Sequence, residues 1–245
     1  MRIGILSDVH GNLEALMAVV HAYRDESVDV LYSLGDTVGY GACPNECSKI
    51  VRGLVKATVL GNHDAAVCGR MDYSYYYEAA RSALDYHAGM LAPDHREWLR
   101  SLPHTVRIDP FDIMLCHGSP ARPEDFDYVF TEEQARGLLP MHDRLPWVTF
   151  IGHSHLCRIF AMSRERAYEI PVGRHVLDAG RKYVISVGSV GQPRDFDNRA
   201  CFTVFDTGSS AIEFRRVPYD IERSAAKIFR TPLERNFAHR LFLGL

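Results

Sequence analysis

The chain has 245 residues, of which 47% are hydrophobic and 24% are charged, and its formal net charge at pH 7 is −3. This length can bury a full hydrophobic core and suits one large α/β domain. The basic residues are dispersed, without a block that neutralises a polyanion, so we expect neither stable nucleic-acid binding nor a membrane-surface role.

The first apolar stretch is too short for a signal peptide, and no run approaches the ~18 apolar residues of a membrane span, which indicates a cytoplasmic protein. The six cysteines include no C-x-x-C pair, so neither a disulfide framework nor a thiolate metal site is supported. Cys43 and Cys47 are one helical turn apart, and we expect both to be small buried residues.

Short apolar runs rich in β-branched residues predict six buried strands. These runs cover residues 3–6, 28–34, 57–60, 113–116, 147–151 and 183–187. Helical signals follow several of them: Asn12 can cap a helix over residues 13–23, Pro44 suits the first turn of a helix reaching residue 54, and Thr131 with Gln134 forms a capping box. This alternation of strand and helix favours an α/β fold.

Other segments depart from this rhythm. Residues 200–205 and 211–217 flank a turn and predict a hairpin added at the far side of the sheet, and a second hairpin turns at Asp109-Pro110. Residues 65–103 contain helical material and are interpreted as an insertion, with a lid as one role, within a single domain over residues 1–245.

Aromatic residues stand out in the insertion and near the end of the chain. Tyr73, Tyr76 and Tyr77, together with Leu84, have helical spacing, which predicts an amphipathic helix packed on the body. The alternative is an exposed aromatic face that stacks a nucleobase. Near the end of the chain, the spacing of the apolar residues predicts a helix docked on the body or on a second subunit. These residues are Leu233, Phe237, Leu241 and Phe242.

Residues of metal-ligand types directly follow five of the predicted strands. They are Asp8 and His10, then Asp36, then Asn62 with His63 and Asp64, then His117, and finally His153 with His155. Because the carboxyl ends of parallel strands share one edge of a sheet, these side chains can converge. Each pair spaced two apart is expected to project to one side of an extended backbone.

The residue types suit two cations, because carboxylates neutralise and bridge ions, imidazoles are neutral donors, and an amide oxygen adds no charge. The alternative is a set of unrelated polar residues at strand ends. That alternative is weakened because five of the twelve histidines fall in these motifs. The ordered series therefore predicts a dinuclear metal site.

The motifs D-x-H, G-D, G-N-H-D, H and G-H-S-H, in this order, resemble the calcineurin-like metallophosphoesterase superfamily. The resemblance implies a four-layer αββα fold, in which helices flank a β-sandwich on both sides. It implies two divalent ions, drawn from manganese, iron, zinc and nickel, without choosing among them. One ion would be held by Asp8, His10, Asp36 and His155, the other by Asp36, Asn62, His117 and His153, with Asp36 as the bridge.

Two further segments, residues 35–41 and 186–194, resemble the small prokaryotic phosphoesterases of this superfamily, some of which are reported as phosphodiesterases. The protein Ser/Thr phosphatase branch has D-R-G where this chain has Gly39-Tyr40-Gly41. Phosphoproteins are therefore not the expected substrates.

Two ions ~4 Å apart would lower the pKa of a bridging water, supply hydroxide to phosphorus and neutralise phosphoryl oxygens. The resemblance implies that His63 faces the substrate and can protonate the leaving oxygen, and the alternative is a further ligand or a structural contact. Asp64 is expected to be structural. Arg194, after a glycine-rich turn, is a candidate for binding a phosphate oxygen, with an ordinary exposed arginine as the alternative.

We therefore expect a dinuclear metal-dependent phosphoesterase that hydrolyses a small phosphodiester or a nucleotide pyrophosphate. One alternative is a phosphomonoesterase of broad specificity. Another is a non-catalytic scaffold with the same fold, against which the retention of all seven ligand types and His63 argues. The expected partner is a small phosphate ester, with a nucleotide as one candidate, and the sequence does not specify an oligomeric state.

Overall fold

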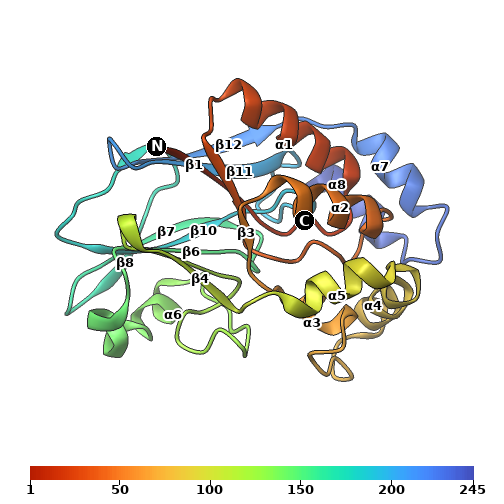
Figure 1. Cartoon of the computed structure of the whole chain (residues 1–245), viewed down its shortest axis with the longest axis horizontal. Helices are drawn as coiled ribbons and strands as arrows, with labels where there is room; N and C mark the ends of the chain where they lie inside the picture. The colour runs from red at the N-terminus through yellow and green to blue at the C-terminus, as the bar shows by residue number, and fades with distance from the viewer.

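The strands that the apolar runs predict assemble into two mixed sheets of six strands, which pack face to face in the computed structural model of residues 1–245 (Figure 1). The first sheet has the order β3 (Ala57–Thr58), β2 (Val30–Ser33), β1 (Arg2–Leu6), β11 (Ala200–Asp206), β12 (Ala211–Val217) and β9 (His175–Val176). The second has the order β4 (Thr105–Ile108), β5 (Ile113–Cys116), β6 (Val148–Ile151), β10 (Lys182–Val187), β7 (Cys157–Met162) and β8 (Ala167–Ile170).

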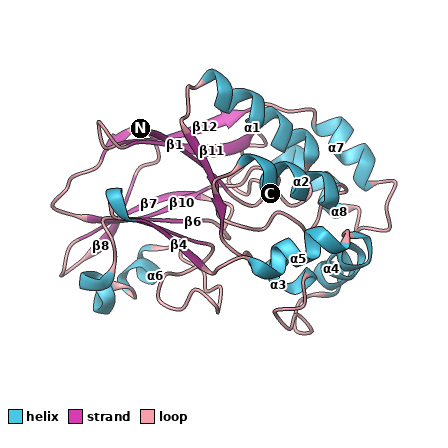
Figure 2. Cartoon of the chain, in the orientation of Figure 1, coloured by secondary structure: helices cyan, strands magenta, loops and turns pink.

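Helices cover the outer face of each sheet (Figure 2). On the first sheet lie α1 (Leu13–Asp25) and α2 (Pro44–Leu54), and on the second lies the short α6 (Glu132–Arg136). The predicted caps are present, since Asn12 Oδ1 accepts a hydrogen bond from Ala15 N, and Thr131 and Gln134 form the capping box. The expected four-layer αββα arrangement is confirmed.

The main core fills the space between the two sheets. Ile3 and Ile5 of β1 meet Phe150 of β6 and Ile185 of β10, and all four side chains are fully buried. Burying one such side chain stabilises the fold by roughly 1.5–3 kcal/mol. This packing fixes where the strands end, and so it positions the loops that follow them.

The remaining helices gather at one end of the sandwich, on the right of Figure 1. The insertion contributes α4 (Glu78–Met90) and α5 (Pro93–Ser101), which adjoin α3 (Asn62–Val67), and the end of the chain forms α7 (Ile221–Ile228) and α8 (Asn236–Leu243). Two short 3₁₀ turns span Asp109–Phe111 and Leu139–Arg144. None of the helices combines the length and the apolar composition that crossing a bilayer requires.

Two sequence predictions are wrong in detail. The tyrosine stretch is not helical, and α4 begins only at Glu78. A tight turn precedes it, in which Ser74 N donates a hydrogen bond to Asp72 Oδ1 and Tyr76 N donates one to Tyr73 O. The β11–β12 hairpin is not at the far side, because β11 pairs antiparallel with β1 inside the first sheet. The hairpin at Asp109-Pro110 is confirmed by the antiparallel pairing of β4 with β5.

Candidate metal centre

All seven predicted ligands lie at the end of the sandwich where the parallel strands finish. Asp8 and His10 follow β1, Asp36 follows β2, and Asn62 opens α3 after β3. From the second sheet, His117 follows β5, and His153 and His155 follow β6. Their exposed fractions are at most 7%, so the structure brings the seven side chains together in a buried cluster.

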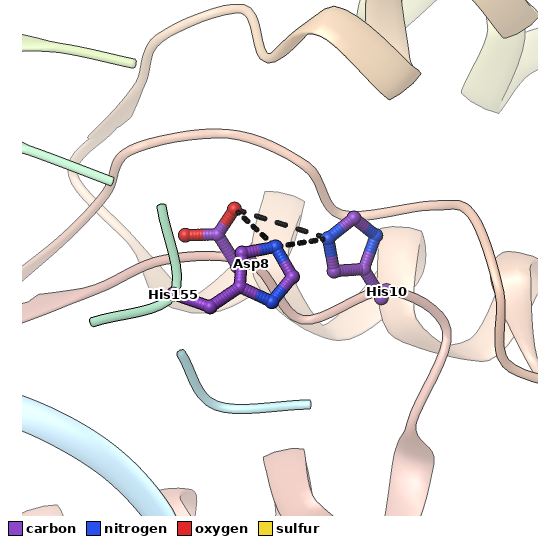
Figure 3. A group of neighbouring side chains, drawn as sticks. All are labelled: Asp8, His10 and His155. Atoms are coloured by element: carbon purple, nitrogen blue, oxygen red, sulfur yellow. Dashed lines mark hydrogen bonds and ion pairs between the residues drawn. The ribbon is translucent and has the colours of Figure 1, made fainter. Parts of the chain in front are cut away.

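Three of the predicted ligands form one compact group (Figure 3). His10 Nε2 and His155 Nε2 are 3.1 Å apart. Asp8 Oδ1 lies 3.8 Å from His10 Nε2 and 3.4 Å from His155 Nε2. One carboxylate oxygen and two imidazole nitrogens thus face a common point.

A second group lies on the other side of Asp36. His117 Nε2 is 3.0 Å from Asn62 Oδ1 and 3.4 Å from Asp36 Oδ2. Asp36, His117 and His153 each offer a ligand atom, and these atoms lie within 4.8 Å of one another. The second group therefore combines carboxylate, amide and imidazole donors.

Asp36 belongs to both neighbourhoods. Its Oδ2 lies 3.6 Å from His10 Nε2 as well as 3.4 Å from His117 Nε2. Its Oδ1 instead accepts a hydrogen bond of 2.8 Å from His63 N. Asp36 Oδ2 is therefore close to both groups. The hydrogen bond from His63 N to the other oxygen, Oδ1, holds the carboxylate in this orientation.

Hydrogen bonds to backbone carbonyls fix the Nδ1 protons of three histidines in the cluster. Nδ1 of His10, His117 and His155 each contacts a backbone carbonyl, of Val38, Leu34 and Gln192 respectively. Because a carbonyl only accepts, each of these Nδ1 atoms carries a proton. The neutral rings of His10 and His155 therefore present Nε2 lone pairs. His117 Nε2 lies 3.0 Å from Asn62 Oδ1, which also only accepts, so this ring is protonated on both nitrogens when no cation is bound. Facing lone pairs and a carboxylate oxygen without a hydrogen bond, Asp8 Oδ1, repel one another unless cations lie among them. The residues present therefore fit divalent metal ions.

The electrostatics of the cluster agree with this reading. Burial lowers the pKa of His10, His153 and His155 well below its usual range, which keeps these rings neutral. Burial also raises the pKa of Asp8 to about 7. Burial alone would lower the pKa of His117, but the negative charge of Asp36 raises it to about 9. Without bound cations, His117 therefore carries positive charge beside Asp36, while His10, His153 and His155 are neutral.

The backbone beneath the ligands is not extended, contrary to the expectation from the two-residue spacing. Asp8, His10, Asp36, His153 and His155 all have positive φ, between 48° and 65°. Each such residue costs of order 1–3 kcal/mol and persists only where the surroundings enforce it. The pairs converge because both members adopt the left-handed conformation, and not because side chains alternate along a strand.

His63 lies beside the cluster, on the first turn of α3. Its side chain is 4% exposed, and its Nδ1 has no hydrogen-bond partner. A side chain at Gly39, which has a φ of 102°, would collide with this ring. Burial lowers the pKa of His63 to about 4, so the ring is neutral near pH 7. Asp64 instead accepts a hydrogen bond from Val38 N through its Oδ1.

Arg194 is not an ordinary exposed arginine. It is half-buried, its Nη2 donates to Gln192 Oε1 at 2.8 Å, and its Nε is buried without a partner. Its guanidinium lies 5.9 Å from the centre of the Tyr40 ring, and no carboxylate forms an ion pair with it. The guanidinium is therefore available to an anion.

Three residues contact the site in ways that were not predicted from the sequence, although Tyr76 was considered as part of an aromatic face. Tyr76 OH accepts a hydrogen bond of 2.8 Å from Asn62 Nδ2, which turns Asn62 Oδ1 toward His117. Tyr128 stacks on His153, with ring centres 3.8 Å apart and planes 13° apart. His87 of α4 accepts from Gly39 N and donates to Gly41 O. None follows a predicted strand, so position along the chain gave no signal for them.

The chain matches one protein family, two curated relatives and a solved structure. A family model described as calcineurin-like phosphoesterase matches residues 1–172. An uncharacterised protein from Methanocaldococcus jannaschii is 36% identical over 244 residues, which cover 99% of this chain and 98% of that protein.

A crystal structure of a metallophosphoesterase from Sphaerobacter thermophilus matches with a TM-score of 0.85 and 34% identity, covering 100% of this chain and 99% of that one. The symmetrical bis(5'-nucleosyl)-tetraphosphatase of Actinobacillus succinogenes is 31% identical over 137 residues, which is 54% of this chain and 48% of that protein.

Proposed function

Because the chain belongs to the calcineurin-like phosphoesterase family, whose members hydrolyse phosphoric esters, we propose that it uses two metal ions to hydrolyse a small phosphodiester or a nucleotide pyrophosphate. The observation that carries the dinuclear reading is the position of Asp36, whose Oδ2 stands between His10 Nε2 and His117 Nε2. A bridging carboxylate needs such a position, because it supplies charge to both ions.

In this proposal, each ion has its own ligands besides the shared Asp36. Asp8, His10 and His155 would hold one ion, and Asn62, His117 and His153 the other. These carboxylate and imidazole sets suit manganese, iron, zinc or nickel. When bound, the ions would lower the pKa of an attacking water and neutralise charge on the phosphoryl oxygens.

Two side chains of the protein would act on the substrate directly. His63 has a buried ring nitrogen without a partner beside the cluster, and it would donate a proton or a hydrogen bond to the leaving oxygen. The ring is neutral near pH 7, and a neutral imidazole carries one N–H that can donate to this oxygen. Arg194 would bind a non-bridging oxygen through the part of its guanidinium that does not contact Gln192.

Two observations bear on the substrate class. The tetraphosphatase of Actinobacillus succinogenes, whose matching segment is about half of this chain, favours a nucleotide pyrophosphate. Gly39-Tyr40-Gly41, where phosphoprotein phosphatases have D-R-G, argues against phosphoproteins. A phosphomonoesterase remains the competing assignment within the enzyme class.

A panel of substrates tests the proposal. Protein stripped of metal is reconstituted separately with Mn²⁺, Fe²⁺, Zn²⁺ or Ni²⁺, and kcat/KM is measured for bis-p-nitrophenyl phosphate, p-nitrophenyl phosphate, a dinucleotide polyphosphate and a phosphopeptide. We expect the diester or the dinucleotide to be cleaved at least as well as the monoester. A preference above about tenfold for monoester or phosphopeptide, ~1.4 kcal/mol in transition-state binding, would overturn the substrate assignment.

A further inference from the structure

A cavity of about 460 Å³ opens directly beside the metal centre. Asn62, His63 and His153 form its inner wall, and five of its twelve lining residues are tyrosines. Pockets for small molecules typically enclose roughly 300–1,000 Å³, so this one can hold a nucleoside-sized group. A group bound here would be next to a phosphate held at the metal centre.

Two tyrosines on the outer wall, Tyr75 and Tyr128, leave much of their rings exposed. Tyr75 is 73% exposed and its hydroxyl makes no hydrogen bond, although its ring edge rests on Tyr76 with centres 5.0 Å apart. Tyr128 is 44% exposed despite its stacking on His153. Large aromatic rings held at the rim of a cavity offer flat faces to a flat ligand.

The charges around the cavity select against a second phosphate. Two carboxylates, Asp125 and Asp127, line it, and no lysine or arginine does. Arg122 pairs with both carboxylates, at 2.9 Å and 3.1 Å, but it is not part of the lining. Carboxylate oxygens accept hydrogen bonds from amino and imino groups, which nucleobases carry at their edges. The cavity therefore suits an uncharged ring with N–H donors.

The cationic side chain of Arg194 borders the cavity only through Tyr40, one of the lining tyrosines. The guanidinium of Arg194 faces the ring of Tyr40 from 5.9 Å and is absent from the cavity lining. A substrate with a base in the cavity would therefore have its phosphates over the metal cluster, with Arg194 near them. This orientation uses the aromatic, acidic and cationic groups together.

We propose that this cavity, which we call the tyrosine cavity and define by Tyr75, Tyr76, Tyr128, Asp125 and Asp127, binds the nucleobase of a nucleotide substrate. This inference rests on the proposed function, because it names the group attached to the phosphate that the metal centre would attack. It assigns the specificity of the enzyme to the inserted segment and to the loop before residue 130.

Binding of products tests the tyrosine cavity without turnover. Calorimetry on the Mn²⁺-loaded protein compares the Kd of adenosine 5'-monophosphate with that of ribose 5-phosphate, which has the same phosphate and no base. We expect the nucleotide to bind at least about tenfold more tightly, as stacking on an aromatic side chain predicts. Equal Kd values would overturn the inference.

Variants at Tyr75 locate the binding. Tyr75→Ala removes the exposed ring with little effect on folding, and it should abolish most of the difference between the two Kd values. Tyr75→Phe keeps the ring and should retain the difference. Phe242→Ala, which removes an exposed ring of α8 outside the cavity, is the matched control. A difference that survives in Tyr75→Ala would contradict the assignment to this cavity.

Turnover separates this inference from the proposed function. The protein should cleave thymidine 5'-p-nitrophenyl phosphate with a higher kcat/KM than methyl p-nitrophenyl phosphate, and Tyr75→Ala should reduce only the former. Failure to cleave both diesters and a dinucleotide polyphosphate would refute the proposed function, while the two Kd values would still decide whether the cavity binds a base. Equal cleavage of both diesters, with equal Kd values, would refute the cavity alone.

Discussion

The metal cluster and the tyrosine cavity share a wall but are built in opposite ways. The cluster comes from loops that leave the ends of buried strands, and its rings are fixed by hydrogen bonds to backbone carbonyls. The outer wall of the cavity comes from residues 71–77 and 125–128, outside the strands and helices, and carries exposed rings such as Tyr75.

The difference separates two requirements of one enzyme. Metal ligands work best when they are held in place before the ions arrive, and the fold buries the proposed ligands and strains the backbone beneath them. A surface that recognises the variable part of a substrate needs reach and adaptability, which loops with exposed aromatic rings supply. We therefore expect changes in the cluster to affect every substrate, and changes in the cavity to affect only some.

The largest expected effect follows Asp36→Asn. An amide in place of the bridging carboxylate removes charge from both ions, so we expect both to be lost and kcat/KM to fall by ~10³-fold or more for all substrates, which is ~4 kcal/mol. Metal content per chain is measured by plasma mass spectrometry. Asp8→Asn is the matched control, because it should weaken only one ion. Normal occupancy of both ions in Asp36→Asn would remove Asp36 from the bridging position.

His63→Ala should have the next largest effect, without loss of metal. Removing the proton donor should slow turnover by roughly 10²-fold on substrates with poor leaving groups, and less on activated aryl esters. A series of leaving groups of different pKa gives the comparison. Equal losses across the series would exclude proton donation, and loss of metal would instead identify His63 as a ligand.

Tyr76→Phe sharpens the comparison, because Tyr76 belongs to both regions. It removes the hydroxyl that binds Asn62 Nδ2, and so it should free the ligand amide to rotate. Loss of such a supporting contact typically costs about 10- to 100-fold in metal affinity or activity, and we expect ~10-fold at one ion. Tyr75→Phe, one residue away, removes a hydroxyl without a partner and should leave metal affinity unchanged. Equal affinities in both variants would show that Tyr76 is only part of the cavity wall.

The sequence predicted the cluster well because its determinants are local. Apolar runs mark the buried strands, and the polar residues directly after them, such as Asp36 and His117, must lie at the edge that those strands share. The helix caps at Asn12 and Thr131 were predictable for a similar reason, since each depends on a side chain and a backbone group three residues apart.

The tyrosine cavity was not predictable in the same way. Tyr73, Tyr76 and Tyr77 have helical spacing, but a turn that begins at Asp72 competes with the helix and delays it to Glu78. The contact of Tyr128 with His153 joins two loops, and no spacing encodes it. The left-handed backbone at Asp8 and His10 also escaped prediction, because it is imposed by the packing around these residues.

The central claim is that this end of the sandwich binds two ions that share Asp36. Anomalous diffraction from crystals soaked in Mn²⁺, recorded at the manganese edge, tests it most directly. We predict two peaks, one near Asp8, His10 and His155, the other near Asn62, His117 and His153, with Asp36 as a ligand to both. A single peak, or two peaks of which one lies away from Asp36, would contradict the account.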